Sequence, residues 1–155
     1  YGAYIERDYE SAINYFEESE SSGFDECLES PDLQVSFSLY FSHSLQLVGD
    51  ERATQRLQFA ARQLNSYSDR GWGGSRLSLY KIALNLLNSN YGEANDELIR
   101  LRAKEIEPFG MIFAEPIFDN FYGNDQIEPT MNLVRLDFEE TRERCNDQQL
   151  VKFGL

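Results

Sequence analysis

Apolar and polar residues follow the 3.6-residue period of amphipathic helices along most of this chain, and three of the helical runs open with similar short motifs. The motifs are Asp8-Tyr9-Glu10-Ser11-Ala12, Asp50-Glu51-Arg52-Ala53 and Tyr91-Gly92-Glu93-Ala94, and their alanines are spaced 41 residues apart. A large apolar residue follows each alanine at the fourth position: Phe16, Leu57 and Leu98. Self-similarity at a fixed period of about 20 to 50 residues is typical of stacked repeats. The sequence therefore predicts an all-α fold built from antiparallel helix pairs.

The expected helices follow from apolar stripes and from residues that begin or end helices. A truncated helix over Tyr1 to Arg7 comes first, and Asp8 starts the next one. The predicted buried stripes are Ala12, Ile13 and Phe16; Ala53, Leu57, Ala60, Ala61 and Leu64; Leu77, Tyr80, Leu84 and Leu87; Ala94, Leu98 and Leu101; and Met131, Val134, Phe138 and Cys145. The predicted breaks are Ser21-Ser22-Gly23, Gly49-Asp50, Asn65 to Gly74, Asn88-Ser89-Asn90 and Glu107-Pro108, and Phe109 to Gly123 is expected to form short aromatic turns before a helix that starts at Pro129.

The segment from Leu33 to Val48 fits two secondary structures. Its first residues alternate apolar and polar side chains, which is a strand pattern, whereas the longer run keeps helical spacing. Ser30 and Pro31 precede it, and serine with a following proline is favoured at a helix start. The segment is also longer than most strands, and the sequence offers no second strand to pair with it. A helix is the better prediction.

The loop expected between Asn65 and Gly74 contains Arg70-Gly71-Trp72-Gly73-Gly74. Glycine-rich loops at helix starts bind phosphate in some folds, but the Gly-Lys-Ser/Thr ending and the preceding strand are both missing here. The glycines therefore predict a turn, with Ser75 as the cap of the next helix. Trp72 is expected to fold back as an anchor between repeats.

Charge and composition restrict the function. The chain has 41% hydrophobic residues and a formal net charge of −13, and Arg7 is the single base among residues 1–51, against twelve acids. Such a field repels phosphate backbones, which argues against direct nucleic-acid binding. No apolar run approaches the roughly 20 residues that cross a bilayer, so no membrane insertion by this segment is expected. The acidic region is either a solvated surface or a docking face for a basic partner.

The sequence shows no recognisable catalytic or metal motif. The single histidine, His43, lies mid-helix without a partner motif and is expected to be a core or groove residue. Asp119 and Asp125 flank a turn but lack the alternating ligands of a calcium loop. Cys27 and Cys145 match no metal or redox spacing and are either two thiols or a disulfide. We therefore expect no enzyme activity, no cofactor and no metal.

The stretch Asp8-Tyr9-Glu10-Ser11-Ala12-Ile13-Asn14-Tyr15-Phe16 resembles the second helix of a tetratricopeptide repeat, which carries Ala-x-x-x-Phe after a short turn. The segment from Glu107-Pro108 through Ala114 to Phe121 resembles the closing stretch of tetratricopeptide-like regions appended to bacterial adenylate cyclases and membrane-anchored winged-helix regulators. The resemblance implies one TPR-like α-solenoid domain over 1–155, with degenerate helix pairs in 1–106 and aromatic turns plus a C-terminal capping helix in 107–155. Tyr1 is not an initiator residue, so the chain is expected to be a piece of a longer protein.

In such stacks the first helix of each pair lines a concave groove, so the resemblance implies a protein or peptide partner. The polar positions expected to line the groove are Tyr4, Ser38, Ser42, Lys81 and Asn88. The leading hypothesis is a protein-interaction module. A ligand- or environment-sensing domain of a bacterial regulator or cyclase is the alternative, and an independent enzyme is the third. The compartment would be cytoplasmic, or periplasmic if the domain belongs to a membrane-anchored regulator.

Overall fold

The computed structural model describes residues 1–23, 30–103 and 109–153, and the described residues form helices joined by short turns, with no strand among them. This confirms the all-α prediction. The elements are α1 (Gly2–Ile5), α2 (Tyr9–Ser21), α3 (Pro31–Leu47), α4 (Arg52–Asp69), α5 (Ser75–Leu87), α6 (Tyr91–Ala103), α7 (Phe109–Ala114), the 3-10 helix η2 (Pro116–Phe121) and α8 (Glu128–Phe153).

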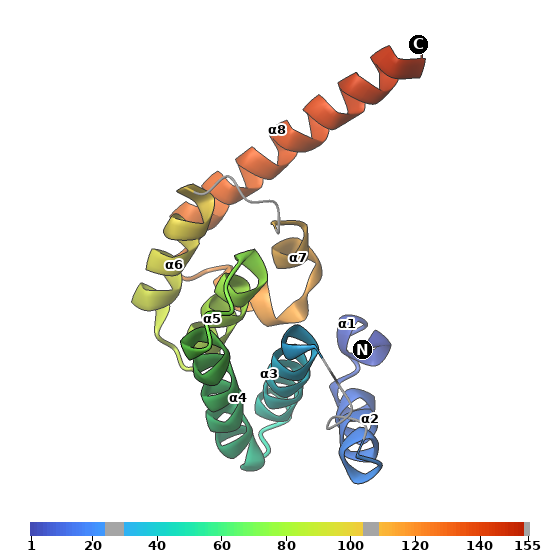
Figure 1. Cartoon of the computed structure of the whole chain (residues 1–155), viewed down its shortest axis with the longest axis vertical. Coiled ribbons are helices and arrows are strands. Elements are labelled where there is room, and N and C mark those ends of the chain that lie inside the picture. The colour runs from blue at the N-terminus through green and yellow to red at the C-terminus, as the bar shows by residue number, and fades with distance from the viewer. Residues whose placement is uncertain (24–29, 104–108, 154–155) are drawn as a thin grey trace.

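Helices that follow one another in sequence pack against each other from α1 to α6, and α3 also contacts α5 (Figure 1). After α6 the chain folds back, so that η2 packs on α5 while α8 packs on α6 and α7. Figure 1 shows α8 running away from the rest of the molecule toward the C-terminus. Because α3 contacts α2, α4 and α5, and α5 contacts α3, α4, α6 and η2, these two are the central helices of this arrangement.

The residues of the 41-residue motif are buried in three different helices, α2, α4 and α6. Ala12, Ala53 and Ala94 are all buried, and so is the large apolar residue that follows each of them at the fourth position. Small side chains at these sites allow neighbouring helices to approach closely. The other predicted stripe residues whose side chains the structure describes are buried as well, except that Ala61, Leu84 and Phe138 are half-buried at the edge of the core. Cys145 lies outside the described side chains.

The central helix α3 confirms the helical reading of its sequence and explains the strand-like alternation. Its serine side chains are buried, and several donate hydrogen bonds to backbone carbonyls one turn earlier on the same helix. Ser42 Oγ donates to the Ser38 carbonyl at 2.7 Å, and Ser44 Oγ to the Tyr40 carbonyl at 2.9 Å. Such back-bonding satisfies a hydroxyl inside the core without a tertiary partner. Polar residues at alternate positions are therefore compatible with a buried helix.

Three predictions for the α4–α5 connection are wrong. Helix α4 continues to Asp69 instead of ending at Asn65, because its last turn packs on α3 through the Tyr67 hydroxyl, which donates to Gln34 Oε1. Ser75 is the first helical residue of α5, and the cap position is Gly74, whose φ of 118° favours glycine. Trp72 is 53% exposed and does not pack between helix pairs.

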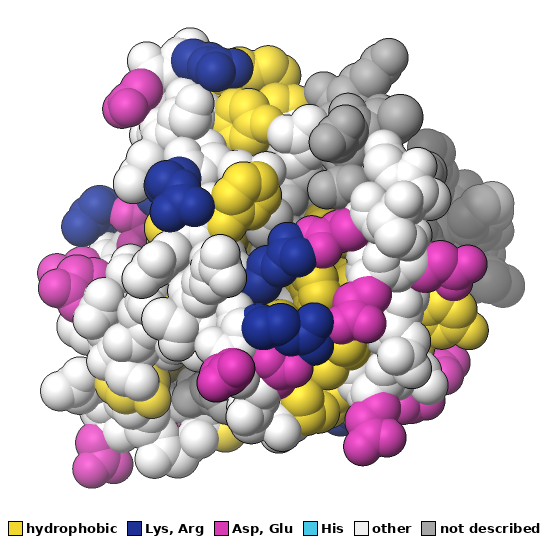
Figure 2. All heavy atoms as spheres, turned by 90° about the horizontal axis from the view of Figure 1, so that it is seen from below, with side chains coloured by type: hydrophobic (Ala, Val, Ile, Leu, Met, Phe, Trp, Pro, Cys, Tyr) yellow, Lys and Arg dark blue, Asp and Glu magenta, His cyan; other side chains and the backbone are white. Residues whose placement is uncertain are grey.

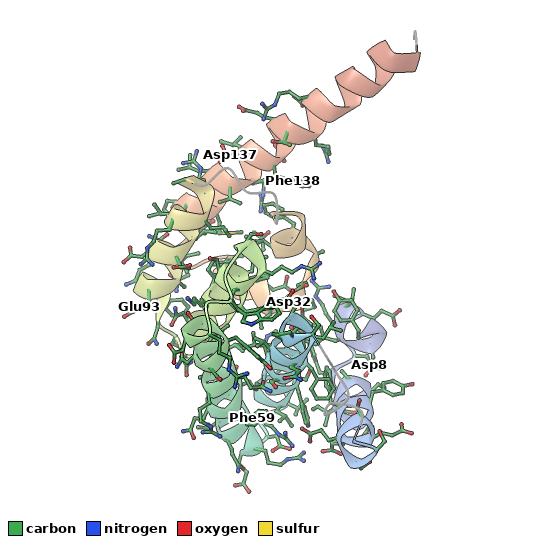
Figure 3. All side chains as sticks on the ribbon, viewed as in Figure 1. Asp8, Asp32, Phe59, Glu93, Asp137 and Phe138 are labelled. Carbon is green, nitrogen blue, oxygen red and sulfur yellow. The ribbon has the colours of Figure 1, made fainter. Side chains whose placement is uncertain are left out.

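Two contacts fix the base of the long helix α8 (Figure 3). Arg102 of α6 pairs with Asp137, with Nε and Oδ2 2.5 Å apart, and the Phe138 ring lies 5.4 Å from the Phe113 ring of α7. These contacts place the base of α8 next to α6 and α7. The predicted helix end at Glu107-Pro108 and the pairing of Cys27 with Cys145 lie outside the described residues and side chains.

Close packing around the motif alanines predicts a difference between two neighbouring sites of α4. Ala60 is fully buried, so Ala60→Leu should lower the free energy of unfolding by about 1–3 kcal/mol because extra methyl groups must be forced into a packed core. Ala61→Leu, one residue further and half-buried, should change it by less than about 0.5 kcal/mol. Urea denaturation followed by circular dichroism measures both values. Equal effects would contradict the packing described here.

Candidate functional site

Three of the five residues predicted to line a groove are buried. Tyr4, Ser38 and Ser42 expose almost none of their side-chain surface. Ser38 Oγ donates to Gln63 Oε1 of α4 at 2.7 Å, and the Ser42 hydroxyl is bonded within its own helix. Tyr4 packs beneath α3, as described below. Their polar atoms are therefore already used within the chain and do not form an open groove surface.

The other two predicted residues lie nearer the solvent. Lys81 of α5 is half-buried, with its Nζ 3.4 Å from Ser68 Oγ of α4. Asn88 caps the end of α5 and is exposed, with its Nδ2 donating to the Leu84 carbonyl at 2.9 Å. The structure therefore does not gather the five residues on one accessible surface, and a partner-binding role for Lys81 and Asn88 stays a prediction.

An aromatic cluster surrounds His43 in the interior. The Tyr4 hydroxyl lies 2.8 Å from His43 Nδ1, a hydrogen-bonding distance, and the Tyr4 ring stacks on Tyr40 with centroids 4.7 Å apart. Tyr9 of α2 meets the edge of His43 at 6.0 Å. Burial disfavours the charged imidazolium and lowers the pKa of His43 from 6.5 to about 4, although the charge of Asp119 opposes this effect. His43 is a core residue, as the sequence predicted.

Glu115 brings a buried carboxyl group to the same region from the other end of the chain. It precedes η2, is 4% exposed, and is hydrogen-bonded to Tyr40 of α3 and Tyr1. Burial raises the pKa of Glu115, and the hydrogen bonds and the charge of Arg76 only partly oppose this. The Glu115 charge in turn adds to burial in raising the pKa of Tyr40. The cluster therefore favours the neutral forms of Glu115 and its tyrosine neighbours.

An ion pair joins the start of the chain to η2 beside this cluster. The Arg7 guanidinium and the Asp119 carboxylate form a two-pronged contact, with Nη2 and Oδ2 2.8 Å apart and Nε and Oδ2 3.0 Å apart. Arg7 connects α1 to α2 with a φ of 62°, which is uncommon for a residue with a side chain. Both side chains are half-exposed, so the pair contributes little to the free energy of folding. Its main effect is to hold the start of the chain next to η2.

These contacts cover the inner side of the molecule, by which we mean the side of α1, α3 and α5 that faces Glu115 and η2. Glu115 and the η2 side chains Ile117, Phe118 and Phe121 are buried, and η2 packs on α5. Asp119 reaches α1 through Arg7, and Glu115 reaches α3 through Tyr40. The chain's own segment therefore covers the polar and aromatic side chains that α1 and α3 would present to a partner.

A second constellation lies on the outside, along α4. The arginine row consists of Arg52, Arg56, Arg62 and Arg70, the last being the residue that ends α4. Three of them lie over aromatic rings: Arg56 is 4.8 Å from the Phe41 ring centroid, Arg62 is 5.9 Å from Phe59, and Arg70 is 5.9 Å from Tyr67. These distances fall within the range of cation–π attraction.

The lower half of the arginine row is neutralised by α2. Arg52 pairs with Glu17 at 2.6 Å and with Asp50 at 2.7 Å, and Arg56 pairs with Glu20. Hydrogen bonds from Arg52 lower the pKa of Asp50 to about 2. Seen from below, basic side chains face acidic ones across a strip of apolar surface (Figure 2). An acidic helix thus already occupies this half of the row.

The upper half of the row is open. Within the described part of the chain, Arg62 and Arg70 have aromatic contacts but no ion-pair partner. Phe59, labelled on α4 in Figure 3, comes three residues before Arg62 and is 43% exposed, and the ring centroids of Trp72 and Tyr67 are 6.5 Å apart. This surface combines exposed aromatic side chains with unpaired guanidinium groups.

Sequence reasoning missed the arginine row, although a signal for it is present. Residues 52–92 contain six lysines and arginines but one acidic residue, Asp69, in a chain whose net charge is −13. The overall charge conceals this basic segment. Counting charge in windows instead of over the whole chain would have located α4 and α5 as the basic part.

Comparisons give no assignment: no family model, curated protein or solved structure matches this chain. The described residues contain no group of three or more His, Cys, Asp and Glu side chains placed to hold a metal ion. Among them, too, no helix is both long and apolar enough to cross a membrane.

The burial of His43 predicts acid sensitivity. Its pKa is lower in the folded chain than in the unfolded chain, so unfolding takes up a proton between pH 6.5 and about 4, and stability should fall as the pH decreases through this range. Because the chain has one histidine, its ring protons can be followed by NMR without ambiguity. The expected titration midpoint is near pH 4. A midpoint near 6.5 would show that the ring is not buried in solution.

Glu115 predicts a pH dependence of the opposite sign. Its folded pKa is raised above the ordinary 4.5, so unfolding releases a proton, and stability should fall as the pH rises from 4.5 through the folded pKa. Glu115→Gln should remove this decline, whereas Glu51→Gln at an exposed site should leave it. Urea denaturation at a series of pH values measures the slope. A slope unchanged by Glu115→Gln would contradict a buried, titrating carboxyl group.

Proposed function

We propose that this chain is a protein-interaction domain that binds a peptide segment of another protein on the outer surface at the end of α4. The exposed aromatic surface around Trp72 carries this proposal. The inner side, where the sequence placed the binding groove, is covered by Glu115 and η2. The partner surface is therefore expected on the opposite, outer side of α3.

The packing of the helices supports a TPR-like stack as the scaffold for this surface. Pairwise contacts join α3 to α4 and α5 to α6, and the motif alanines lie buried on the second helix of each pair. The contact between α3 and α5 relates the first helices of neighbouring pairs. Such stacks present rigid extended surfaces to partners, and α8 beside α6 would serve as the cap at one end.

Trp72 has the properties of an anchor residue for binding. Its side chain is 53% exposed, yet it is held by an edge contact with Tyr67, whose hydroxyl donates to Gln34 of α3. Tryptophan, tyrosine and arginine are the residues most enriched among those that dominate binding energy. An exposed tryptophan supported by a hydrogen-bonded tyrosine gives a partner a large apolar contact at small entropic cost.

A peptide-display selection against the purified domain tests the proposal. Peptides selected on the wild-type chain should bind Trp72→Ala more weakly by on the order of 30-fold, because truncating an anchor residue typically removes about 2 kcal/mol. Tyr15→Ala is the matched control, since Tyr15 of α2 is an exposed aromatic residue away from α4. Fluorescence anisotropy measures the dissociation constants.

The selection can also contradict the proposal. Because Trp72 is exposed, Trp72→Ala should change the free energy of unfolding by less than about 0.5 kcal/mol, so a loss of binding would not reflect unfolding. Peptides that bind Trp72→Ala as tightly as wild type would place the site elsewhere. Lys81→Ala with Asn88→Ala would then test the α5 positions predicted from the sequence. A selection that yields no binding peptide would argue against the function itself.

A further inference from the structure

We propose that the partner segment is an acidic helix, which the open half of the arginine row recognises through Arg62 and Arg70. This inference rests on the proposed function and adds the chemistry of the partner to it. The open half is defined by Arg62 and Arg70 together with the exposed aromatic side chains Phe59 and Trp72.

The molecule itself shows how this row binds an acidic helix. Glu17 and Glu20, one turn apart on α2, pair with Arg52 and Arg56, one turn apart on α4. Phe41 lies beneath Arg56 and also stacks on Phe16 of α2, with ring centroids 5.2 Å apart. The recognition pattern is therefore two carboxylates on one helical face with an apolar residue between the helices.

The upper half also combines two arginines with aromatic rings, here the rings of α4 itself, and no ion pair occupies it among the described residues. Arg62 and Arg70 are eight residues apart, which corresponds to about 12 Å along a helix. Each guanidinium lies over an aromatic ring, as Arg56 does, so the rings hold the cations at the surface. Exposed Phe59 and Trp72 supply the apolar contact that Phe41 supplies below.

Charge complementarity decides between possible partners. Residues 52–92 are strongly basic while the rest of the chain is acidic, so an acidic segment is attracted to α4 and repelled from α2 and α8. A basic segment would be repelled from α4 and attracted to α2 and α8. Carboxylates spaced two turns apart on a helix match the separation of Arg62 and Arg70, and guanidinium groups bind carboxylates with two hydrogen bonds.

Two synthetic helical peptides test the inference by fluorescence anisotropy. The acidic peptide carries glutamates at positions 1, 4, 8 and 11 of one helical face with leucine and phenylalanine between them, as a helix spacing of about 3.6 residues requires. Its twin has glutamine at each of these positions. We expect the acidic peptide to bind wild type more tightly than the twin, with an affinity that decreases as salt concentration rises.

The protein variants locate the binding. Arg62→Glu with Arg70→Glu should weaken binding of the acidic peptide by about tenfold or more, since two attractive contacts become repulsive. Arg142→Glu with Arg144→Glu makes the same charge change at exposed positions of α8 and should leave binding nearly unchanged. Equal weakening by both pairs, no weakening by the α4 pair, or no binding to wild type would overturn the inference.

The design separates this inference from the proposed function. If the glutamine twin binds as tightly as the acidic peptide and Trp72→Ala weakens both, the acidic partner is wrong while the peptide-binding function stands. If the display selection yields no binding peptide, the function fails as well. Thermal unfolding of each variant confirms that the comparison is made between folded proteins.

Discussion

The central constraint on this molecule is that α3 is surrounded by other helices although its sequence is rich in polar side chains. Helices α2, α4 and α5 contact it, and Glu115 approaches it from the segment before η2. A buried hydroxyl or imidazole without a partner is costly, so each polar group of α3 needs one inside the protein. The Ser42 hydroxyl donates a hydrogen bond to a carbonyl of its own helix, and the Ser38 hydroxyl donates to Gln63. The Tyr4 hydroxyl is the hydrogen-bond partner of His43. The positions of α1 and η2 follow from these requirements.

The sequence was informative where local pattern decides structure. Amphipathic stripes located the helices, and the 41-residue spacing identified the alanines that are buried in α2, α4 and α6. It failed where a contact joins distant segments. Tyr4 was predicted to line a groove because no residue near it in the sequence indicates that its hydroxyl bonds to His43, 39 positions away. The buried Glu115 was missed for the same reason: its partners, Tyr1 and Tyr40, are 114 and 75 residues away.

The two polar constellations differ in their accessibility, which supports a structural role for the inner cluster and the proposed partner-binding role for the arginine row. In the inner cluster, burial raises the pKa of Tyr40 and Glu115 and lowers that of His43, which favours the neutral form of each group. The polar atoms of these side chains have their partners within the chain. The outer row keeps its charges at the surface, stacked on aromatic rings. Altered pKa values often mark functional sites. Here the altered pKa values of His43, Tyr40 and Glu115 mark the packed interior, while Arg62 and Arg70 lie on the outer surface proposed for a partner.

The ion pair between Arg7 and Asp119 has a consequence for the order in which the chain folds. The two residues are 112 positions apart, so their contact forms only after the residues between them, helices α2 to α7 included, have been synthesised. Helix α1 has four residues, too few to be stable alone, and the covering segment that holds it arrives late. Contacts between distant segments form slowly because a long loop must close first. The inner face should therefore be exposed on the ribosome longer than any other part of the core, and a nascent chain would depend on its own late segment to bury it.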